Sequence, residues 1–365
     1  MARNSTLGAA KAAKNDEFYT QRQDIENELS HYEDHFRGKV VYCNCDDPAE
    51  SEFWKFFQRN FTAWGLKRLI ATHYEPNDQN FSYMIEMKPG DPWDKEPEKV
   101  PLPCNGDFRS AACIELLKQA DIVVTNPPFS LFREYVAQLM EYGKKFVIIG
   151  NQNAITYKEF FPLLKENKVW IGYSSNKTMI FRVPDGYKYD SKLTEMINDG
   201  YHYGKVPAIS WFTNLDIAKR HDPLDLRSNY YDPEKYPRYD NYDAVEVSKV
   251  DDIPCDYDGV MGVPITFMAK YCPEQFEIVG ISKTWATNFE VDKSRVYSFA
   301  HQHNKDGSVS SGSKINDGGA IALRERPVGI YYTDDAEDNA GKYLIQVYAR
   351  VFIRNKRPIK GAVAV

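Results

Sequence analysis

The sequence predicts an α/β fold built around a mostly parallel sheet. Between residues 39 and 151, short apolar runs alternate with longer segments in which apolar residues recur at helical spacing. Such runs are typical of parallel strands buried on both faces, and the helical segments between them supply the crossovers that parallel strands need. One run ends abruptly in "DIVVTNPPF", where two consecutive prolines cannot extend a strand.

Each predicted element follows from its local pattern. Apolar residues at helical spacing predict a helix within 23–36, and the aromatic-rich segment 51–64 predicts an amphipathic helix that faces the core. The remaining elements of the alternation are strands at 39–44, 68–74, 121–126 and 145–151, and helices at 110–120 and 131–143.

The pattern changes in the second half of the chain. Residues 172–254 are rich in Tyr, Asp, Asn and Pro and show no regular alternation. A long segment of this kind is uncommon in a folded domain unless it is functional. Strand-like segments return at 262–271 and 276–283, a Gly/Ser-rich loop follows at 303–319, and 341–356 predicts a hairpin or one long strand.

The composition favours a cytoplasmic protein without metal or disulfide bonds. The apolar runs are too short to span a bilayer, and the first residues lack the apolar core of a signal peptide, so we expect no membrane attachment. The six cysteines include no Cys-x-x-Cys pair, and the seven histidines form no ligand cluster. We therefore expect neither a disulfide framework nor a metal site.

The charge is distributed unevenly, and one basic segment could contact nucleic acid. A net charge of −6 argues against bulk attraction, so any such binding needs a basic patch. No acidic residue occurs from Asn339 onward. This basic segment could contact phosphates of a nucleic acid, or it could be a solvated basic tail. The cations of this segment are Lys342, Arg350, Arg354, Lys356, Arg357 and Lys360, of which we single out Arg354, Lys356 and Arg357.

The turn after the strand at 121–126 is the candidate catalytic site. Ligands of open parallel sheets bind at the carboxyl ends of the strands, where Asn126 lies. Its side-chain oxygen and the carbonyl of Pro127 form two acceptors for the two N–H groups of an exocyclic aromatic amine, and Phe129 offers a ring for stacking. An electrophile suited to so weak a nucleophile is a sulfonium methyl group, which needs alignment above all. The alternative is a plain turn or a cis-proline loop.

Four segments resemble the motifs of amino methyltransferases that use S-adenosylmethionine. "NPPF" matches their [DNS]-P-P-[YFW] signature, and "DEFYTQ" (16–21), "VVYCNCDDP" (40–48) and "NGDFRS" (105–110) resemble companion motifs in the same order. This order matches the gamma arrangement, and the sequence is similar to the EcoRI-type adenine-specific DNA methyltransferases. It departs from the wider superfamily because no Phe-x-Gly-x-Gly follows the first strand.

The resemblance implies a set of site residues. Asn126, Pro127 and Phe129 would be catalytic, and the Phe-Tyr-Thr run would embrace the methionine part of the cofactor. Asp46 and Asp47 would receive its ammonium group, although both could simply cap a helix near Ala49. The implied cofactor-binding residues are Phe18, Tyr19, Thr20, Asn44, Asp46, Asp47, Tyr74, Glu75, Asp107 and Phe108.

The resemblance also implies a fold and an activity. We expect a Rossmann-like class I methyltransferase sheet in a cofactor-binding catalytic domain (16–180), after a flexible arm (1–15) and before a DNA-recognition region with late strands and a basic tail (181–365). The expected reaction is transfer of a methyl group to the 6-amino group of an adenine flipped out of duplex DNA. Double-stranded DNA is the expected partner of a monomer or weak dimer, and a separate restriction endonuclease could act on the same sequence.

Other functions remain open at this point. An RNA guanine or protein glutamine methyltransferase uses the same Asn-Pro-Pro turn. Glu86 and Lys88 lie on a strand-like segment, as in metal-dependent nucleases, and a binding protein that has lost catalysis would keep the fold.

Overall fold

The computed structural model forms two compact units. Met1–Ala154 and Val169–Ile217 form the first unit, and Ile155–Lys168 and Ala218–Val365 form the second. The predicted boundary after residue 180 lies inside strand β9 (Lys177–Val183) of the first unit, which continues to Ile217. The structure describes residues 18–45, 47–75, 82–94, 96–183, 195–198, 200–230, 234–287, 289–291 and 293–359, so the predicted arm at 1–15, Asp46 and Lys360 lie outside the described residues.

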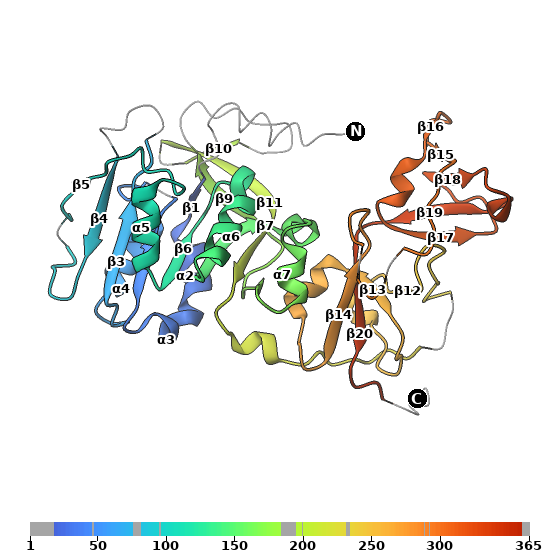
Figure 1. Cartoon of the computed structure of the whole chain (residues 1–365), viewed down its shortest axis with the longest axis horizontal. Coiled ribbons are helices and arrows are strands. Elements are labelled where there is room, and N and C mark those ends of the chain that lie inside the picture. Colours follow the sequence, from blue (N-terminus) through green and yellow to red (C-terminus); the bar gives the residue numbers. More distant parts are fainter. Residues whose placement is uncertain are drawn as a thin grey trace. The chain divides into compact units, whose positions relative to one another are not determined.

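A large mixed sheet forms the middle of the first unit (Figure 1). Its central strands β7, β6, β2 and β3 are parallel, and the strands beyond them on both sides are antiparallel to their neighbours. The bounds in spatial order are β1 (Tyr19–Thr20), β9 (Lys177–Val183), β11 (Tyr201–Thr213), β7 (Lys145–Asn151), β6 (Ile122–Thr125), β2 (Val40–Cys43), β3 (Arg68–Thr72), β4 (Tyr83–Met87) and β5 (Val100–Pro101), with β8 (Trp170–Ile171) and β10 (Glu195–Asn198) paired to β11.

The sheet is therefore mixed rather than mostly parallel, which corrects the sequence prediction. Only 73–82 joins β3 to β4, and a connection of that length is too short for the crossover that a parallel neighbour would need. On the other side, β11 is antiparallel to both β7 and β9. The four predicted strands are confirmed as β2, β3, β6 and β7.

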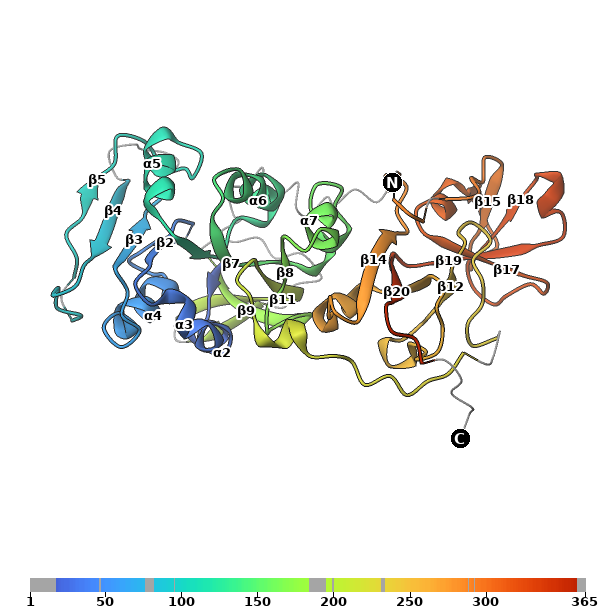
Figure 2. The ribbon, with the colours of Figure 1, turned by 60° about the horizontal axis from the view of Figure 1, so that its bottom comes forward.

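Helices cover both faces of this sheet, with α5 and α6 on one side and α2, α3 and α4 on the other (Figure 2). α4 begins after Ser51, whose hydroxyl accepts from Phe53 N, and its aromatic side chains are buried, which confirms a core-facing helix. The segment predicted as one helix at 23–36 is broken by a 3-10 turn. The bounds are α2 (Arg22–Leu29), η1 (Ser30–Tyr32), α3 (Glu33–Phe36), α4 (Glu52–Asn60), α5 (Ala111–Gln119), η3 (Phe129–Leu131), α6 (Phe132–Glu141) and η4 (Gln152–Thr156).

The second unit contains two small sheets. In the described residues, one has the order β12 (Val245–Glu246), β13 (Met261–Pro264), β20 (Arg350–Asn355), β14 (Phe276–Ile281). The other has the order β16 (Val309–Ser311), β15 (Ala300–His303), β18 (Tyr331–Asp334), β19 (Tyr343–Val347), β17 (Gly319–Leu323). The helical elements are α7 (Phe161–Lys165), η5 (Ala218–His221), η6 (Val250–Asp252), η7 (Ile265–Lys270), η8 (Ser313–Asn316) and η9 (Glu337–Asn339).

Three predictions for this unit need correction. The segment 341–356 is neither a hairpin nor one strand, because β19 joins the five-stranded sheet and β20 joins the four-stranded sheet. The segment 262–271 is a strand only at its start and continues as η7, whereas 276–283 is confirmed as β14. The Gly/Ser-rich loop 303–319 contains β16 and η8. No helix in the described part of the chain is long and apolar enough to cross a membrane.

Candidate active site

The candidate site lies at the carboxyl edge of the parallel strands. β3 continues the sheet on one side of β2 and β6 lies on the other, so the point where the strand order reverses falls between β2 and β6. Asn44 and Asn126 directly follow these two strands, and both side chains are buried. This is the place where open α/β sheets bind their ligands.

Asn126 is held in one orientation by the backbone of Phe18. The Asn126 Nδ2 group donates a hydrogen bond of 2.7 Å to Phe18 O. Because a carbonyl oxygen can only accept, the amide nitrogen must face Phe18, and this fixes where the amide oxygen lies. Asn126 Oδ1 is buried and accepts no hydrogen bond within the described residues, although such an atom is costly to bury unpaired.

Three aromatic rings surround this turn. Phe129 stacks on Phe18 with ring centroids 5.6 Å apart, and both rings also contact Phe181. Phe18 directly precedes β1, which pairs with β9 in the register Thr20↔Phe181. Sheet pairing therefore brings the amino-terminal Phe-Tyr-Thr run to the Asn-Pro-Pro-Phe turn, more than a hundred residues away in sequence. Pro127 is buried and Phe129 is partly buried.

Arg182 contacts side chains from three neighbouring segments. Its guanidinium group lies 4.7 Å from the ring centre of Tyr19 and 4.6 Å from that of Tyr201, and it donates a 2.5 Å hydrogen bond to Glu50. These contacts join β1, β9 and β11 to the segment between β2 and α4. Arg182 could not be found from the sequence, because nothing near it in the chain indicates these partners.

The loop after β2 is shaped by side-chain hydrogen bonds. Asn44 Oδ1 accepts from the hydroxyl of Tyr135 on α6. Asp47 Oδ1 accepts from Ala49 N at 3.0 Å and Tyr83 OH at 3.2 Å, and His73 Nδ1 lies 3.5 Å away. Burial raises the pKa of Asp47, but these donors, His73 first, bring it below its ordinary value. The carboxylate therefore stays ionised at neutral pH.

The loop after β3 packs tightly on the 104–107 segment. Glu75 N donates to Asn105 O at 2.9 Å. Gly106 adopts a positive φ of 80°, and a Cβ there would lie 2.0 Å from His73 O. Only glycine fits this conformation and this approach. As a result Tyr74 and Glu75 lie beside the segment that carries Asp107.

Asp107 and Phe108 have defined partners of their own. Asp107 Oδ2 accepts from Arg109 Nη2 at 2.6 Å and Oδ1 accepts from Arg109 N at 2.8 Å, and the Arg109 side chain lowers the pKa of Asp107. Phe108 is buried and packs edge-on against Tyr135, with centroids 5.1 Å apart. Tyr135 thus contacts both Phe108 and Asn44 and joins two of the predicted cofactor segments.

Several further buried acceptors at this edge have no partner within the described residues. They are Thr20 Oγ1 on β1, Thr125 Oγ1 at the end of β6 and Gln152 Oε1 just after β7. Like Asn126 Oδ1, each is an unsatisfied buried polar atom, which is rare in a native interior and calls for a ligand or water. Gln152 was missed from the sequence, although its place directly after an apolar strand at 145–151 was a usable signal.

The predicted nucleic-acid contacts do not form an acid-free patch. Arg354 Nη1 lies 3.1 Å from Glu277 Oε2 and 3.4 Å from Glu290 Oε2, and Lys356 Nζ donates to Pro273 O at 2.7 Å. Arg350 forms a buried ion pair with Glu246. The basic segment is therefore not a solvated tail up to Asn355, because it contains β19 and β20 in the sheets of the second unit.

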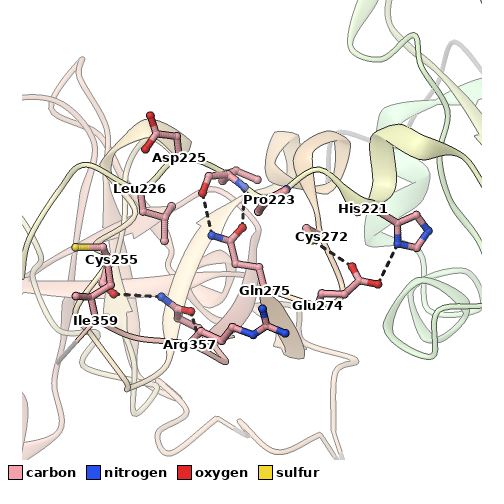
Figure 3. Close-up of a pocket in the computed structure, with 12 residues that line it drawn as sticks. His221, Pro223, Asp225, Leu226, Cys255, Cys272, Glu274, Gln275, Arg357 and Ile359 are labelled. Carbon is pink, nitrogen blue, oxygen red and sulfur yellow. Dashed lines mark hydrogen bonds and ion pairs between the residues drawn. The ribbon is translucent and has the colours of Figure 1, made fainter.

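Arg357 lines a pocket of about 430 Å³ in the second unit (Figure 3). Asp225 and Glu274 line the same pocket, so its charge is mixed. Glu274 accepts from Cys272 Sγ and contacts His221 Nδ1 at 2.9 Å, and Leu224 exchanges two hydrogen bonds with Gln275. Across the described residues, no three His, Cys, Asp or Glu side chains gather as metal ligands would.

The nuclease alternative and the histidines at 301–303 can also be compared with the structure. Glu86 Oε2 lies 2.5 Å from Arg68 and Oε1 lies 2.5 Å from Lys88, so both oxygens of the suggested nuclease carboxylate are engaged. The His-Gln-His run at 301–303 lies in β15, where His301 contacts Asp335.

Comparison with known proteins identifies the family of the chain. The model of the family "Adenine-specific methyltransferase EcoRI" matches residues 6–356. The Type II methyltransferase M.EcoRI of Escherichia coli is 50% identical over 299 residues, which are 78% of this chain and 92% of that protein. M.MpnI of Mycoplasma pneumoniae is 44% identical over 301 residues, covering 81% and 91%, and M.MgeORF184P of Mycoplasma genitalium is 42% identical over 273 residues, covering 74% and 84%. No solved structure matches the chain. The chain therefore belongs to the EcoRI family of adenine-specific methyltransferases.

Proposed function

We propose that the protein transfers a methyl group from S-adenosylmethionine to the 6-amino group of an adenine in double-stranded DNA. Membership of an adenine-specific family supports adenine as the target over the guanine or glutamine of the alternative methyltransferases. The observation that carries the proposal is Asn126 Oδ1, a buried and unpaired acceptor whose orientation is fixed by the bond from Nδ2 to Phe18 O.

Asn126 and Pro127 would hold the amine that reacts. The amide oxygen of Asn126 and the carbonyl of Pro127 accept its two N–H groups, and both acceptors stabilise the positive charge that develops on the nitrogen during attack. The hydrogen bond to Phe18 keeps the amide from turning its nitrogen toward the substrate. The acceptors are therefore preorganised, and no general base or covalent enzyme intermediate is required.

The residues at this edge fit the proposed cofactor. When bound, S-adenosylmethionine supplies a methyl group activated by its positively charged sulfur. Ionised Asp47 suits the ammonium group of its methionine part, and the unpaired hydroxyl of Thr20 suits a polar contact. Glu75 would bind the ribose of the cofactor, and Tyr74 would cover its adenine. Asp107 and Phe108 would bind the adenine of the cofactor, and since a carboxylate has about four acceptor positions, Arg109 leaves Asp107 capacity for a further donor.

The depth of the site implies base flipping. Asn126 is only 6% exposed at the end of its strand, so an adenine stacked within a duplex could not bring its amine to this side chain. The base would have to leave the helix, which costs a few kcal/mol. Stacking on the partly buried ring of Phe129 returns about 1–3 kcal/mol.

The sheet supports a Rossmann-like class I methyltransferase fold. The parallel order β7, β6, β2, β3 places the reversal point between β2 and β6, and the proposed cofactor and amine-binding residues follow these strands. We further infer that the second unit reads the DNA sequence, and that the protein works in the cytoplasm as a monomer or weak dimer, with any restriction endonuclease as a separate protein.

The test combines a transfer assay with a binding assay. Wild-type protein should transfer label from S-adenosylmethionine to adenine in unmethylated DNA, at one sequence motif. Asn126→Ala should lower the single-turnover rate by about 10² to 10³ while leaving the Kd for S-adenosylmethionine within about twofold. Label in RNA or protein instead of DNA would overturn the substrate, and equal loss of transfer and cofactor binding would overturn the role of Asn126.

Asn214→Ala is the matched control. Asn214 is also a buried asparagine that clamps backbone groups, because Oδ1 accepts from Phe146 N and Nδ2 donates to Lys144 O. It lies near the start of β7, at the opposite edge of the sheet from Asn126. This variant should lower the melting temperature and leave the transfer rate of the folded protein unchanged.

A further inference from the structure

The five-stranded sheet of the second unit carries a groove between two of its connections. The turn from β15 to β16 and the connection from β17 to β18 form its walls, and its volume is about 700 Å³. β15 ends at His303, which pairs with Tyr331 at the start of β18, so both connections leave the sheet at the same edge (Figure 1). The lining residues are Asn304, Lys305, Gly307, Arg326, Pro327, Val328, Gly329, Ile330 and Tyr331.

The charge of the groove is positive. Lys305 and Arg326 line it and are exposed, and none of its lining residues is acidic. Asp306 lies next to Lys305 in sequence, but its carboxylate accepts from the N–H and hydroxyl of Ser308 within its own turn. Two cations and no carboxylate line the groove, which on a chain with a net charge of −6 suits a polyanion.

The Arg326 and Asn304 side chains of the groove are held in place. The Arg326 guanidinium lies over the ring of Tyr331, 5.1 Å from its centre, and this ring stacks on His303 with centroids 4.5 Å apart. Asn304 Nδ2 donates to Ser308 Oγ at 3.0 Å, and its oxygen accepts from Gln302 Nε2 at 2.6 Å. A fixed guanidinium loses little entropy when it meets a phosphate.

An apolar tip stands on one wall of the groove. Val328 is 105% exposed, which is the highest value among the large apolar side chains described, and Ile330 is 47% exposed. Pro327 fixes the backbone on one side of Val328, and Gly329 on the other side adopts a positive φ of 108°. A stiff turn that projects a fully solvated valine beside two cations has no role in the packing of the protein itself.

We propose that this groove binds the duplex that the enzyme methylates, with Lys305 and Arg326 on phosphates and the Val328 tip wedged into the minor groove. Apolar wedges flanked by cations are a recurrent way to bind and bend DNA at that groove. This inference rests on the proposed function, because it takes duplex DNA as the substrate. It assigns DNA binding to the 304–308 and 326–331 segments rather than to Arg354, Lys356 and Arg357.

The salt dependence of binding tests the two cations. The Lys305→Gln/Arg326→Gln double variant should bind cognate duplex less tightly, and its slope of log K against log salt should be less negative by about 1.8. The control is Lys118→Gln/Lys168→Gln, which removes the same charge from exposed lysines that each face a nearby glutamate. This control should keep the wild-type slope, and equal slopes for all three proteins would overturn the proposal.

Val328→Ser tests the tip. Because Val328 is fully exposed, the variant should fold as the wild type does and keep the salt slope. It should weaken duplex binding by about tenfold, since one apolar side chain is no longer buried. Unchanged DNA affinity would overturn the wedge, and a change in sedimentation of the free protein would instead make the tip a contact between two copies of the chain.

The experiment separates this proposal from the proposed function. The single-turnover methylation rate at saturating DNA should stay within about twofold of wild type in all of these variants, because the groove acts on binding. If the wild-type protein does not methylate DNA, the proposed function fails. If the wild type methylates DNA and the groove variants bind it as the wild type does, only the groove proposal fails.

Discussion

Arg350 can be tested for a structural role against a DNA-binding role. The sequence places it in an acid-free basic segment, but in the structure its guanidinium faces Glu246. Arg350 Nη2 donates to Glu246 Oε1 at 2.7 Å, and Nε lies 3.0 and 3.1 Å from the two carboxylate oxygens. The side chains are 12% and 3% exposed, and Tyr239 OH also donates to the carboxylate.

The size of the effect of Arg350→Met follows from this burial. Methionine keeps much of the aliphatic packing of the arginine but leaves the Glu246 carboxylate buried without a cation. Removal of one partner of a buried ion pair costs about 3–5 kcal/mol, which would be a large part of the stability of a domain. The Glu246→Gln/Arg350→Met double variant has no buried charge and keeps an acceptor for Tyr239. It should recover roughly 2 kcal/mol relative to Arg350→Met.

The assay is urea unfolding of wild type, the two single variants and the double variant at neutral pH, followed by the salt dependence of DNA binding. Chains with more than one domain commonly depart from two-state unfolding, so the m value is compared across variants before free energies are subtracted. An Arg350→Met protein within 1 kcal/mol of wild type, with a salt slope less negative by about 0.9, would refute the structural role and support a phosphate contact.

Two further predictions concern buried groups of the first unit. Thr20→Val should weaken S-adenosylmethionine binding by about tenfold in calorimetry without lowering the stability of the free protein, because the buried hydroxyl has no partner in the described chain. Lower stability with unchanged affinity would make the hydroxyl structural. Glu28 is fully buried and accepts from Tyr32 OH and from the N–H groups of Tyr173 and Ser174, and burial raises its pKa above the ordinary 4.5 despite these bonds. The stability that this group adds is present below pH 4.5 and is lost as pH rises through its folded pKa. Glu28→Gln should therefore remove that pH dependence from urea unfolding and lower the free energy of unfolding by about 1–3 kcal/mol. An unchanged pH profile would contradict the assignment.

The parallel strands and the Asn126 turn could be predicted because their signals are local. A run of four apolar or β-branched residues, followed by Asn126 and two prolines, defines both the end of β6 and the position of Asn126. The helix α4 could likewise be predicted, since four of its aromatic side chains fall on one face. These signals could not show the orientation of the Asn126 amide, because the group that fixes it, Phe18 O, is 108 residues away in the chain.

The basic carboxyl-terminal segment shows why a run of basic residues in the sequence does not predict free cations in the structure. No acid lies near Arg350 or Arg354 in sequence, so composition alone suggests free cations. Their partners come from other strands, and Glu246 and Glu277 are 104 and 77 residues away. Ion pairs across a sheet depend on which strands become neighbours, and the pattern in this region did not reveal that β20 lies between β13 and β14.

The missing glycine motif after β2 has a structural counterpart. In the wider superfamily, glycines at this position let the backbone approach the cofactor. Here Asn44 and Asp47 are held by side chains from other elements, because Tyr135 donates to Asn44 and Tyr83 donates to Asp47. A loop braced in this way can present carboxylate and amide oxygens where other enzymes present backbone N–H groups. The absence of glycines therefore argues for a different set of contacts at the same edge of the sheet, and it does not argue against a cofactor there.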